Sequence, residues 1–168
     1  SKDPAKEVKF QIKNYNFDQL IDFVDEVPFE DIQFIQDGID MNMRIAEIGV
    51  SSDLGVGYGK YLYNKAGTLY EKAKAYTAAA SEARMSGYPL PVMSSAGSGN
   101  HGLVAILPIK IIGDGLNIGQ EKIIRAITLS HLVTVYVKVY LGVLSPVCGC
   151  GVAAGVGCAA GLTYLRGG

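Results

Sequence analysis

The chain has little of the residues that cross-link or anchor a fold: no tryptophan, two histidines and three cysteines in 168 residues. The three thiols, Cys148, Cys150 and Cys158, lie too close together to staple a chain of this length. This spacing excludes a secreted disulfide scaffold. The polar N-terminus, SKDPAKEVKF, lacks the apolar core of a secretory signal, so we expect a cytoplasmic protein. Neither end resembles a natural terminus, and we expect a piece of a longer protein.

Charge is also scarce, at 18% of residues with a formal net charge of −1. The chain has no basic run with interleaved aromatic residues, which argues against nucleic acid and anionic membranes as partners. Hydrophobic residues make up 49% of the chain, enough to bury one substantial core. We therefore predict a single domain over residues 1–168.

Apolar residues recur at helical spacing, which predicts a mainly α fold built as a compact bundle of buried helices. Thr68 and Glu71 have the spacing of a capping box at the start of an alanine-rich helix. Residues 103–112 fit either a buried strand or a short buried helix, and the neighbouring helical patterns favour a helix. The alanine-rich helix is expected over residues 68–86, and the other helices are expected over residues 16–24, 30–49, 120–141 and 148–165.

An uncharged stretch from Val139 to Leu165 is long enough to raise the question of a membrane span. It also contains pairs of glycines at the spacing of membrane helix dimers. Pro146 and a glycine-rich turn interrupt it, and neither tryptophan nor paired basic residues flank it. We therefore predict a helix packed closely inside the fold and no membrane partner.

Two glycine-rich segments interrupt the helical pattern. The first, SSDLGVGYGK at residues 51–60, has neither P-loop nor dinucleotide-binding spacing, so we expect a flexible turn. The second, PVMSSAGSGNHG at residues 91–102, is rich in residues that tolerate left-handed backbone. These residues are Gly97, Gly99, Asn100 and Gly102. We predict a shaped loop there rather than helix or strand.

The second segment has the composition of an anion-binding loop. Successive amides from Ser95 to Gly99 would form a nest for a carboxylate or phosphate, and the hydroxyls of Ser94, Ser95 and Ser98 would add donors. The alternative is a plain glycine-rich connection that binds nothing.

Five further residues carry candidate chemistry. His101, in the loop, is a candidate base, whereas His131 lies on an apolar helix and fits a hydrogen-bonded core histidine better than a base. Arg84 is either a carboxylate clamp or a favourable charge at a helix C-terminus. Cys148 and Cys150 lie on a Pro/Gly turn before a helix, where free amides favour thiolates. They are metal-ligand candidates, although a zinc or iron-sulfur site needs three or four ligands; buried inert thiols are the alternative.

The GSGNHG segment is locally similar to the loop that clamps an amino-acid carboxylate in pyridoxal-phosphate dehydratases. The rest of that pattern is missing, because no lysine lies in a matching Schiff-base context and no phosphate cup follows. We expect no pyridoxal phosphate.

Three separated blocks carry a second and more extensive resemblance: GIDMNMRIAEIG, ARMSGYPLPVMSSAGSGNHGLVAILPI, and RAITLSHLVTVYVKVYLGVLSPVCGCGVAAGVGCAAGLTYLRGG. With them the chain resembles the L-cysteine desulfidase group of the serine-dehydratase alpha-chain-like family. The resemblance implies a mostly helical catalytic domain that eliminates hydrogen sulfide or water from a small L-amino acid. The implied cofactor is a [4Fe-4S] cluster with one open iron, and the products from cysteine are pyruvate, ammonia and hydrogen sulfide.

The resemblance also implies residue roles. It assigns a cluster ligand to Cys148, with Cys150 as the close alternative, and the remaining ligands to a segment beyond residue 168. Residues 94–101 would hold the substrate carboxylate, and Asn100 and His101 would orient its amino or leaving group. With one family ligand, this chain alone should bind no stable cluster and be inactive. The alternatives are an L-serine dehydratase alpha chain, a non-catalytic helical module that binds an amino acid, and a membrane helix bundle; a homodimer is a further expectation.

Overall fold

The protein is built from helices, and the computed structural model describes residues 10–142 and 145–168. In chain order the elements are η1 (Ile12–Asn14), α2 (Phe17–Glu26), α3 (Phe29–Ile32), α4 (Ile35–Ser51), α5 (Tyr58–Lys65), α6 (Leu69–Met85), α7 (Gly99–Gly115), α8 (Gln120–Leu141), the π-helical turn η2 (Cys150–Ala154) and α9 (Gly155–Leu165). Within the described residues no β-strand forms. The predicted mainly α fold is confirmed, and residues 103–112 are helical.

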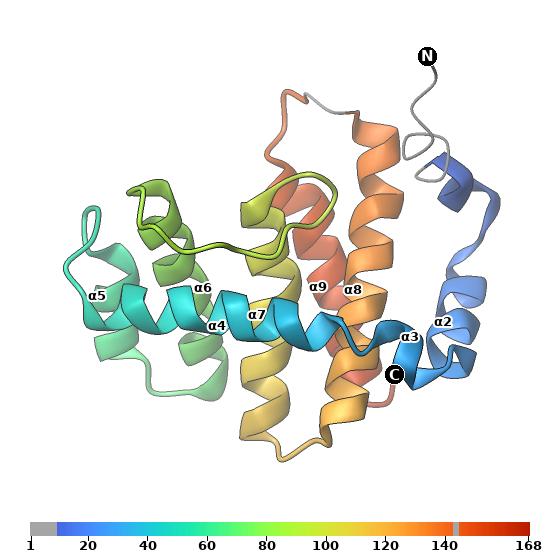
Figure 1. Ribbon diagram of the computed structural model, residues 1–168, viewed down its shortest axis with the longest axis horizontal. Helices are drawn as coiled ribbons and strands as arrows, with labels where there is room; N and C mark the ends of the chain where they lie inside the picture. Colours follow the sequence, from blue (N-terminus) through green and yellow to red (C-terminus); the bar gives the residue numbers. More distant parts are fainter. Residues whose placement is uncertain (1–9, 143–144) are drawn as a thin grey trace.

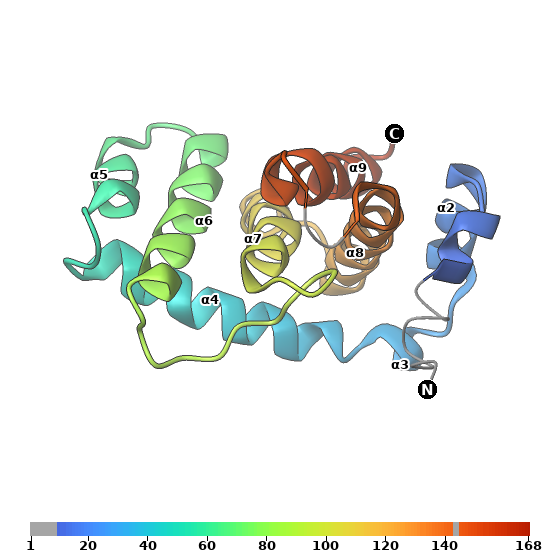
Figure 2. The same ribbon diagram turned by 90° about the horizontal axis from the view of Figure 1, so that it is seen from above.

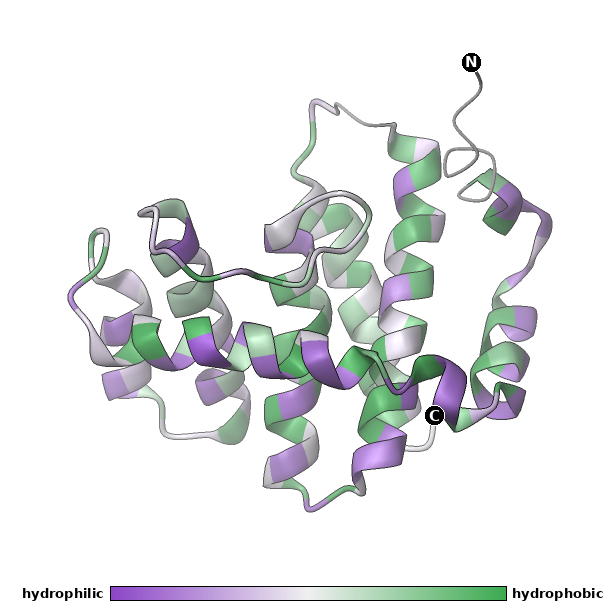
Figure 3. Ribbon diagram, in the orientation of Figure 1, coloured by the Kyte–Doolittle hydropathy of each residue, from purple (hydrophilic) through white to green (hydrophobic). Residues whose placement is uncertain are grey.

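Three helices, α7, α8 and α9, pack side by side as the centre of the molecule (Figure 2). Helix α4 crosses in front of them, with α5 and α6 on one flank and α2 on the other (Figure 1). Hydrophilic and hydrophobic residues alternate along α4, as expected for a helix with one face on the core (Figure 3). The largest fully buried side chains of the central helices include Leu103, Ile106, Leu107, Ile109, Ile123, Ile124, Ile127 and Leu129.

Close backbone approach explains the glycines of α9. A Cβ on Gly161 would lie 2.6 Å from the carbonyl oxygen of Ala126, and one on Gly157 would clash with the carbonyl oxygen of Ser130. Both partners belong to α8, so the two helices touch backbone to backbone. The spacing that resembles a membrane dimer motif thus serves packing within this chain, as predicted.

Helix α8 is long and apolar enough to cross a membrane by length and composition, but half of its most apolar window is buried inside the fold. Helix α8 ends at Leu141, where Gly142 takes a positive φ of 82°. The next helical segment starts only at Cys150. The uncharged stretch 139–165 is therefore not one continuous helix, and α8 has the burial of a core helix.

The predicted helix starts are partly wrong near the N-terminus. The predicted capping box forms from Thr68 and Glu71 on α6, and a second one, which was not predicted, forms from Asn16 and Gln19 on α2. The helix expected from residue 30, however, is split into the short α3 and the long α4. The apolar spacing continues across the break and conceals it from a periodicity argument.

The glycine-rich segment 51–60 is held by an internal carboxylate. The Glu82 carboxylate accepts hydrogen bonds from the backbone N–H groups of Val56 (2.8 Å), Gly59 (3.0 Å) and Tyr58 (3.3 Å). The hydrogen bond from Gly59 is the largest cause of the lowered pKa of Glu82. The expected flexible turn is corrected here: Tyr58 already begins α5, and the amides that resemble a phosphate cradle bind the protein's own carboxylate.

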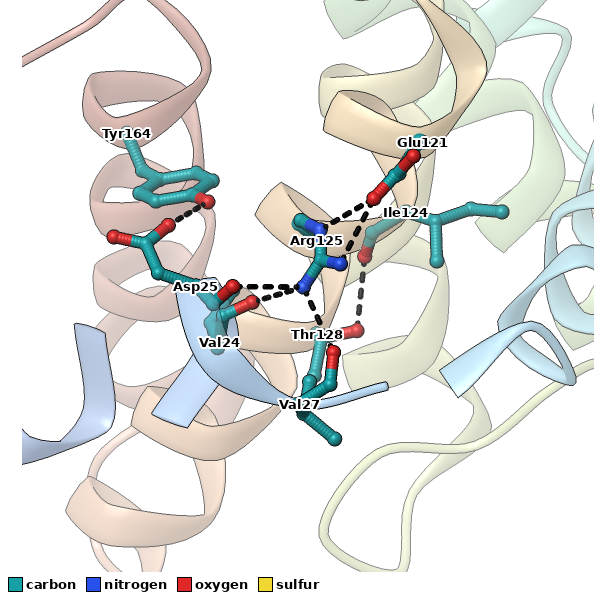
Figure 4. Close-up of polar contacts among 8 residues, drawn as sticks. All are labelled: Val24, Asp25, Val27, Glu121, Ile124, Arg125, Thr128 and Tyr164. Carbon is teal, nitrogen blue, oxygen red and sulfur yellow. Dashed lines mark hydrogen bonds and ion pairs between the residues drawn. The ribbon is translucent and has the colours of Figure 1, made fainter. Parts of the chain in front are cut away.

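Arg125 fastens α2 to the central helices (Figure 4). Its guanidinium donates to the Val24 carbonyl oxygen (2.6 Å) and to the Glu121 carboxylate (2.8 Å). The last carbonyl oxygens of a helix receive no hydrogen bond from an N–H group of that helix. At the end of α2, an arginine from α8 donates to them instead. The Tyr164 hydroxyl donates to Asp25 and ties the same helix end to α9. This attachment holds α2 beside the cavity described below.

Candidate functional site

The segment between α6 and α7 is a tight turn followed directly by a helix. Ser95 and Ser98 exchange two backbone hydrogen bonds of 3.0 Å each, and Ala96 and Gly97 between them have φ values of 49° and 81°. This is the geometry of a two-residue hairpin turn with left-handed central residues. Gly99 then begins α7.

This geometry corrects two expectations about residues 94–102. Gly99, Asn100, His101 and Gly102 are the first turn of α7 rather than part of a loop. The amides of Ser95 and Ser98 bond within the hairpin, so a nest of five free amides is not what forms. The donors that replace it are the first N–H groups of α7, which no helix satisfies internally.

Two contacts fix the path of this segment. The buried side chain of Asn42, on α4, accepts the Met93 N–H at 2.9 Å. The Met93 carbonyl then lies so close to Gly102 that any Cβ there would clash with its oxygen. The segment is therefore pinned between α4 and α7, and glycine at position 102 is required by the close approach.

Ser95 and His131 form one part of the predicted site. Ser95 is buried, and its Oγ lies 2.8 Å from His131 Nδ1. Burial lowers the pKa of His131 to about 4, so the imidazole is neutral at pH 7. Its Nε2 is buried and has no hydrogen-bond partner among the described residues. His131 therefore anchors the hairpin to α8, and Ser94 lies beside this contact on the wall of a cavity.

Arg84 and Asn100 form the second part. Arg84, in the last turn of α6, donates from Nη1 to Asn100 Oδ1 at 3.0 Å. A Cβ on Gly99 would lie 2.5 Å from Arg84 Nε, so the guanidinium packs against the first residue of α7. A cation is thus held at the positive end of a helix dipole. The same guanidinium also lies in the last turn of α6, where the negative end of that helix dipole favours a cation.

The buried side chain of His101 brings the start of α7 to the cysteine turn. A Cβ on Gly149 would lie 2.5 Å from His101 Nε2 and 3.4 Å from Lys138 Nζ. The imidazole therefore lies against the backbone between the two thiols. Lys138 was not among the predicted site residues. The sequence feature that could have pointed to Lys138 is that it is the single charged residue in the otherwise apolar second half of α8.

The two thiols of this turn differ in environment. Cys148 is exposed, and backbone N–H groups, that of Gly151 above all, lower the pKa of its thiol. Burial raises the pKa of Cys150, while the charges of Lys138 and Arg84 act in the opposite direction. Cys148 is therefore the better thiolate.

Cys158 lies apart from this turn in the hydrophobic core, where burial raises its pKa to about 12. It has the properties of an inert core thiol.

The residues present do not make a complete metal site. Among residues 10–142 and 145–168, no group of three or more His, Cys, Asp or Glu side chains is placed to hold a metal ion. The turn offers two thiols, whereas a four-iron cluster needs three or four ligands. The donor chemistry of Cys148 suits a cluster ligand, but a whole cluster does not fit on the described residues.

The described residues form a helical domain in which Arg84 packs on the start of α7 and His101 joins that helix to a Cys-x-Cys turn. Residues 5–168 match the serine dehydratase alpha chain family, and the chain belongs to that family.

Three relatives are each named as a UPF0597 protein. A UPF0597 protein of Caldanaerobacter subterraneus is 63% identical over 161 residues, which is 96% of this chain and 38% of that protein. A UPF0597 protein of Clostridium tetani is 61% identical over 94% of this chain and 37% of its own length. One of Desulfatibacillum aliphaticivorans is 46% identical over 98% and 39%. The chain thus spans well under half the length of these relatives. No solved structure matches it.

Proposed function

We propose that the full-length protein is a lyase that removes a β-substituent from a small L-amino acid, with L-cysteine as the substrate and pyruvate, ammonia and hydrogen sulfide as products. The observation that carries the proposal is the guanidinium of Arg84 at the N-terminus of α7, beside the cysteine turn. Membership of the serine dehydratase alpha chain family supports the same reaction class.

In this proposal the substrate carboxylate binds between Arg84 and the first amides of α7. A carboxylate there neutralises the guanidinium and accepts N–H groups that the helix leaves free. Asn100, already bonded to Arg84 at 3.0 Å, holds the guanidinium in place. The hairpin around Ser95, anchored by His131, fixes where α7 begins.

His101 is proposed to transfer the proton. The reaction breaks the Cα–H and Cβ–S bonds and forms a Cα–Cβ double bond, and the aminoacrylate released is hydrolysed to pyruvate and ammonia. His101 Nε2 would take the α-proton and return it to the departing sulfide, so that protons balance. Its burial against Gly149 places this nitrogen beside the turn.

We propose Cys148 as one thiolate ligand of a [4Fe-4S] cluster in the full-length protein, with Cys150 as the alternative. When bound, such a cluster supplies a Lewis acid for the leaving group. The remaining ligands would come from outside this chain.

The test is anaerobic assay of the reconstituted full-length protein for pyruvate and sulfide from L-cysteine, and for pyruvate from L-serine. Turnover of L-serine alone would favour the serine dehydratase alternative, in which water leaves. Binding of an amino acid without turnover of either would refute the lyase and favour the non-catalytic module.

Two variants separate the proposed roles. Arg84→Gln should raise KM for L-cysteine about tenfold or more, because a charged hydrogen bond to the carboxylate is lost. His101→Asn should lower kcat by about 10²-fold with little change in KM. Arg44→Gln, an exposed arginine on α4, is the control and should match the wild type.

A further inference from the structure

The structure contains a cavity that the proposed reaction does not use. Its volume is about 700 Å³, and it lies between η1, α2, the start of α4 and α8, with residues 93–96 along one side. Apolar side chains make most of its wall, among them Leu20, Phe23, Ile32, Ile35, Leu132 and Val135. Neither Arg84 nor the cysteine turn contributes to it. Small-molecule sites in proteins have this size and this predominantly apolar lining.

A few polar groups gather on the side formed by the hairpin and α8. Ser94, Ser95 and His131 lie there, with Ser95 Oγ bonded to His131 Nδ1 at 2.8 Å. The imidazole is neutral, because burial lowers its pKa to about 4. These groups are hydrogen-bonding but uncharged at pH 7.

The charge of the cavity has one sign. Among the described residues that line it, Asp31 is the single charged side chain, and no lysine or arginine is present. Phe23 and Phe34, both about half exposed, line the same cavity. Aromatic faces and a carboxylate both attract cations and repel anions.

We propose that this cavity is a second binding site, for a small organic cation with an apolar body. Among the described lining residues, a free carboxylate would meet Asp31 and no compensating cation. The ligand is therefore of a different class from the amino-acid carboxylate proposed at Arg84.

Three probes of one shape and different charge test the proposal: tryptamine, indole and indole-3-propionate. Their affinities for the full-length protein are measured by titration calorimetry and saturation-transfer NMR. At low salt we expect tryptamine to bind about tenfold more tightly than indole-3-propionate, with indole between them. In 0.5 M salt the Debye length falls to about 4 Å, so this difference in affinity should shrink.

Cavity variants locate the binding. Val135→Phe places a larger side chain into the cavity and should weaken tryptamine binding at least tenfold. Val56→Phe makes the same change at a valine that is 93% exposed in another part of the molecule, and it should leave the affinity for tryptamine unaltered. Equal thermal midpoints of the two variants would show that the difference is not caused by unfolding.

Charge variants test the selectivity. Asp31→Asn should remove the preference for tryptamine over indole-3-propionate, whereas Asp37→Asn, an exposed carboxylate on α4 outside the lining, should keep it. Equal binding of all three probes, or unchanged binding by Val135→Phe, would overturn the proposal. So would binding to the 168-residue chain but not to the full-length protein, because another segment would then fill the cavity.

Discussion

Replacing Gly149 by alanine tests the contact that joins α7 to the cysteine turn. The new methyl group would lie 2.5 Å from His101 Nε2 and 2.8 Å from Cε1. Carbon atoms pack comfortably at about 3.5 Å, so the imidazole must move by about 1 Å. His101 is only 6% exposed, and its neighbours leave little room for that movement.

A displacement of about 1 Å in a group that takes part in the reaction costs on the order of 10²-fold in rate. We therefore expect Gly149→Ala to reduce kcat for pyruvate formation by about 10²-fold in the full-length protein. The imidazole NMR signals of His101 should shift as well, which measures the displacement without any assay of activity.

Gly151→Ala is the matched control in the same motif. A Cβ at Gly151 meets no atom within 4 Å, so this variant should keep its activity and its His101 signals. If Gly149→Ala also kept the wild-type signals, the packing of His101 against the turn would be refuted. Shifted signals with unchanged kcat would instead refute the proposed role of His101.

Three further predictions concern stability, measured by urea denaturation. Because the pKa of His131 is lowered from 6.5 to about 4, the unfolded chain binds this proton more readily, so stability should rise by about 3 kcal/mol between pH 4 and pH 7, and His131→Asn should flatten that rise. Glu82→Gln should cost about 1 kcal/mol at pH 7, since three backbone donors, two of them exposed, lose a charged acceptor; Glu30→Gln, an exposed control, should cost almost nothing. The pKa of Glu82 is lowered in the folded state, so its contribution should disappear as the pH falls below 4.5. Arg125→Lys should cost about 1–3 kcal/mol and increase amide exchange in α2 first, because a lysine cannot cap the helix end and bind Glu121 in the same fork geometry.

The helical architecture was predictable because helix formation leaves local signals. The capping pair Thr68 and Glu71 lies three residues apart, and the buried Leu20 and Val24 of α2 lie one helical turn apart. The break between α3 and α4 left no such signal. Neither did the start of α7 at Gly99, because glycine and asparagine are poor helix formers and the helix is stabilised by packing.

The candidate site was predictable in residue type but not in arrangement. The segment around Ser95 and the cysteine turn stood out from composition alone. Their grouping did not, because Ser95 pairs with His131, and His101 with Gly149, across sequence separations that no local pattern reports. The role of Glu82 as an internal anion was hidden for the same reason.

The helical class, most helix positions, the family and the candidate chemical groups were all readable from the amino-acid sequence, since each depends on nearby residues or on motif identity. Tertiary structure alone decided that the predicted residues occupy two neighbourhoods. Arg84 packs on the start of α7 and His101 on Gly149 of the cysteine turn, whereas Ser95 and His131 border an apolar cavity. The physical reason is backbone contact: glycines at positions 102 and 149 let distant segments approach to distances that only the folded chain defines.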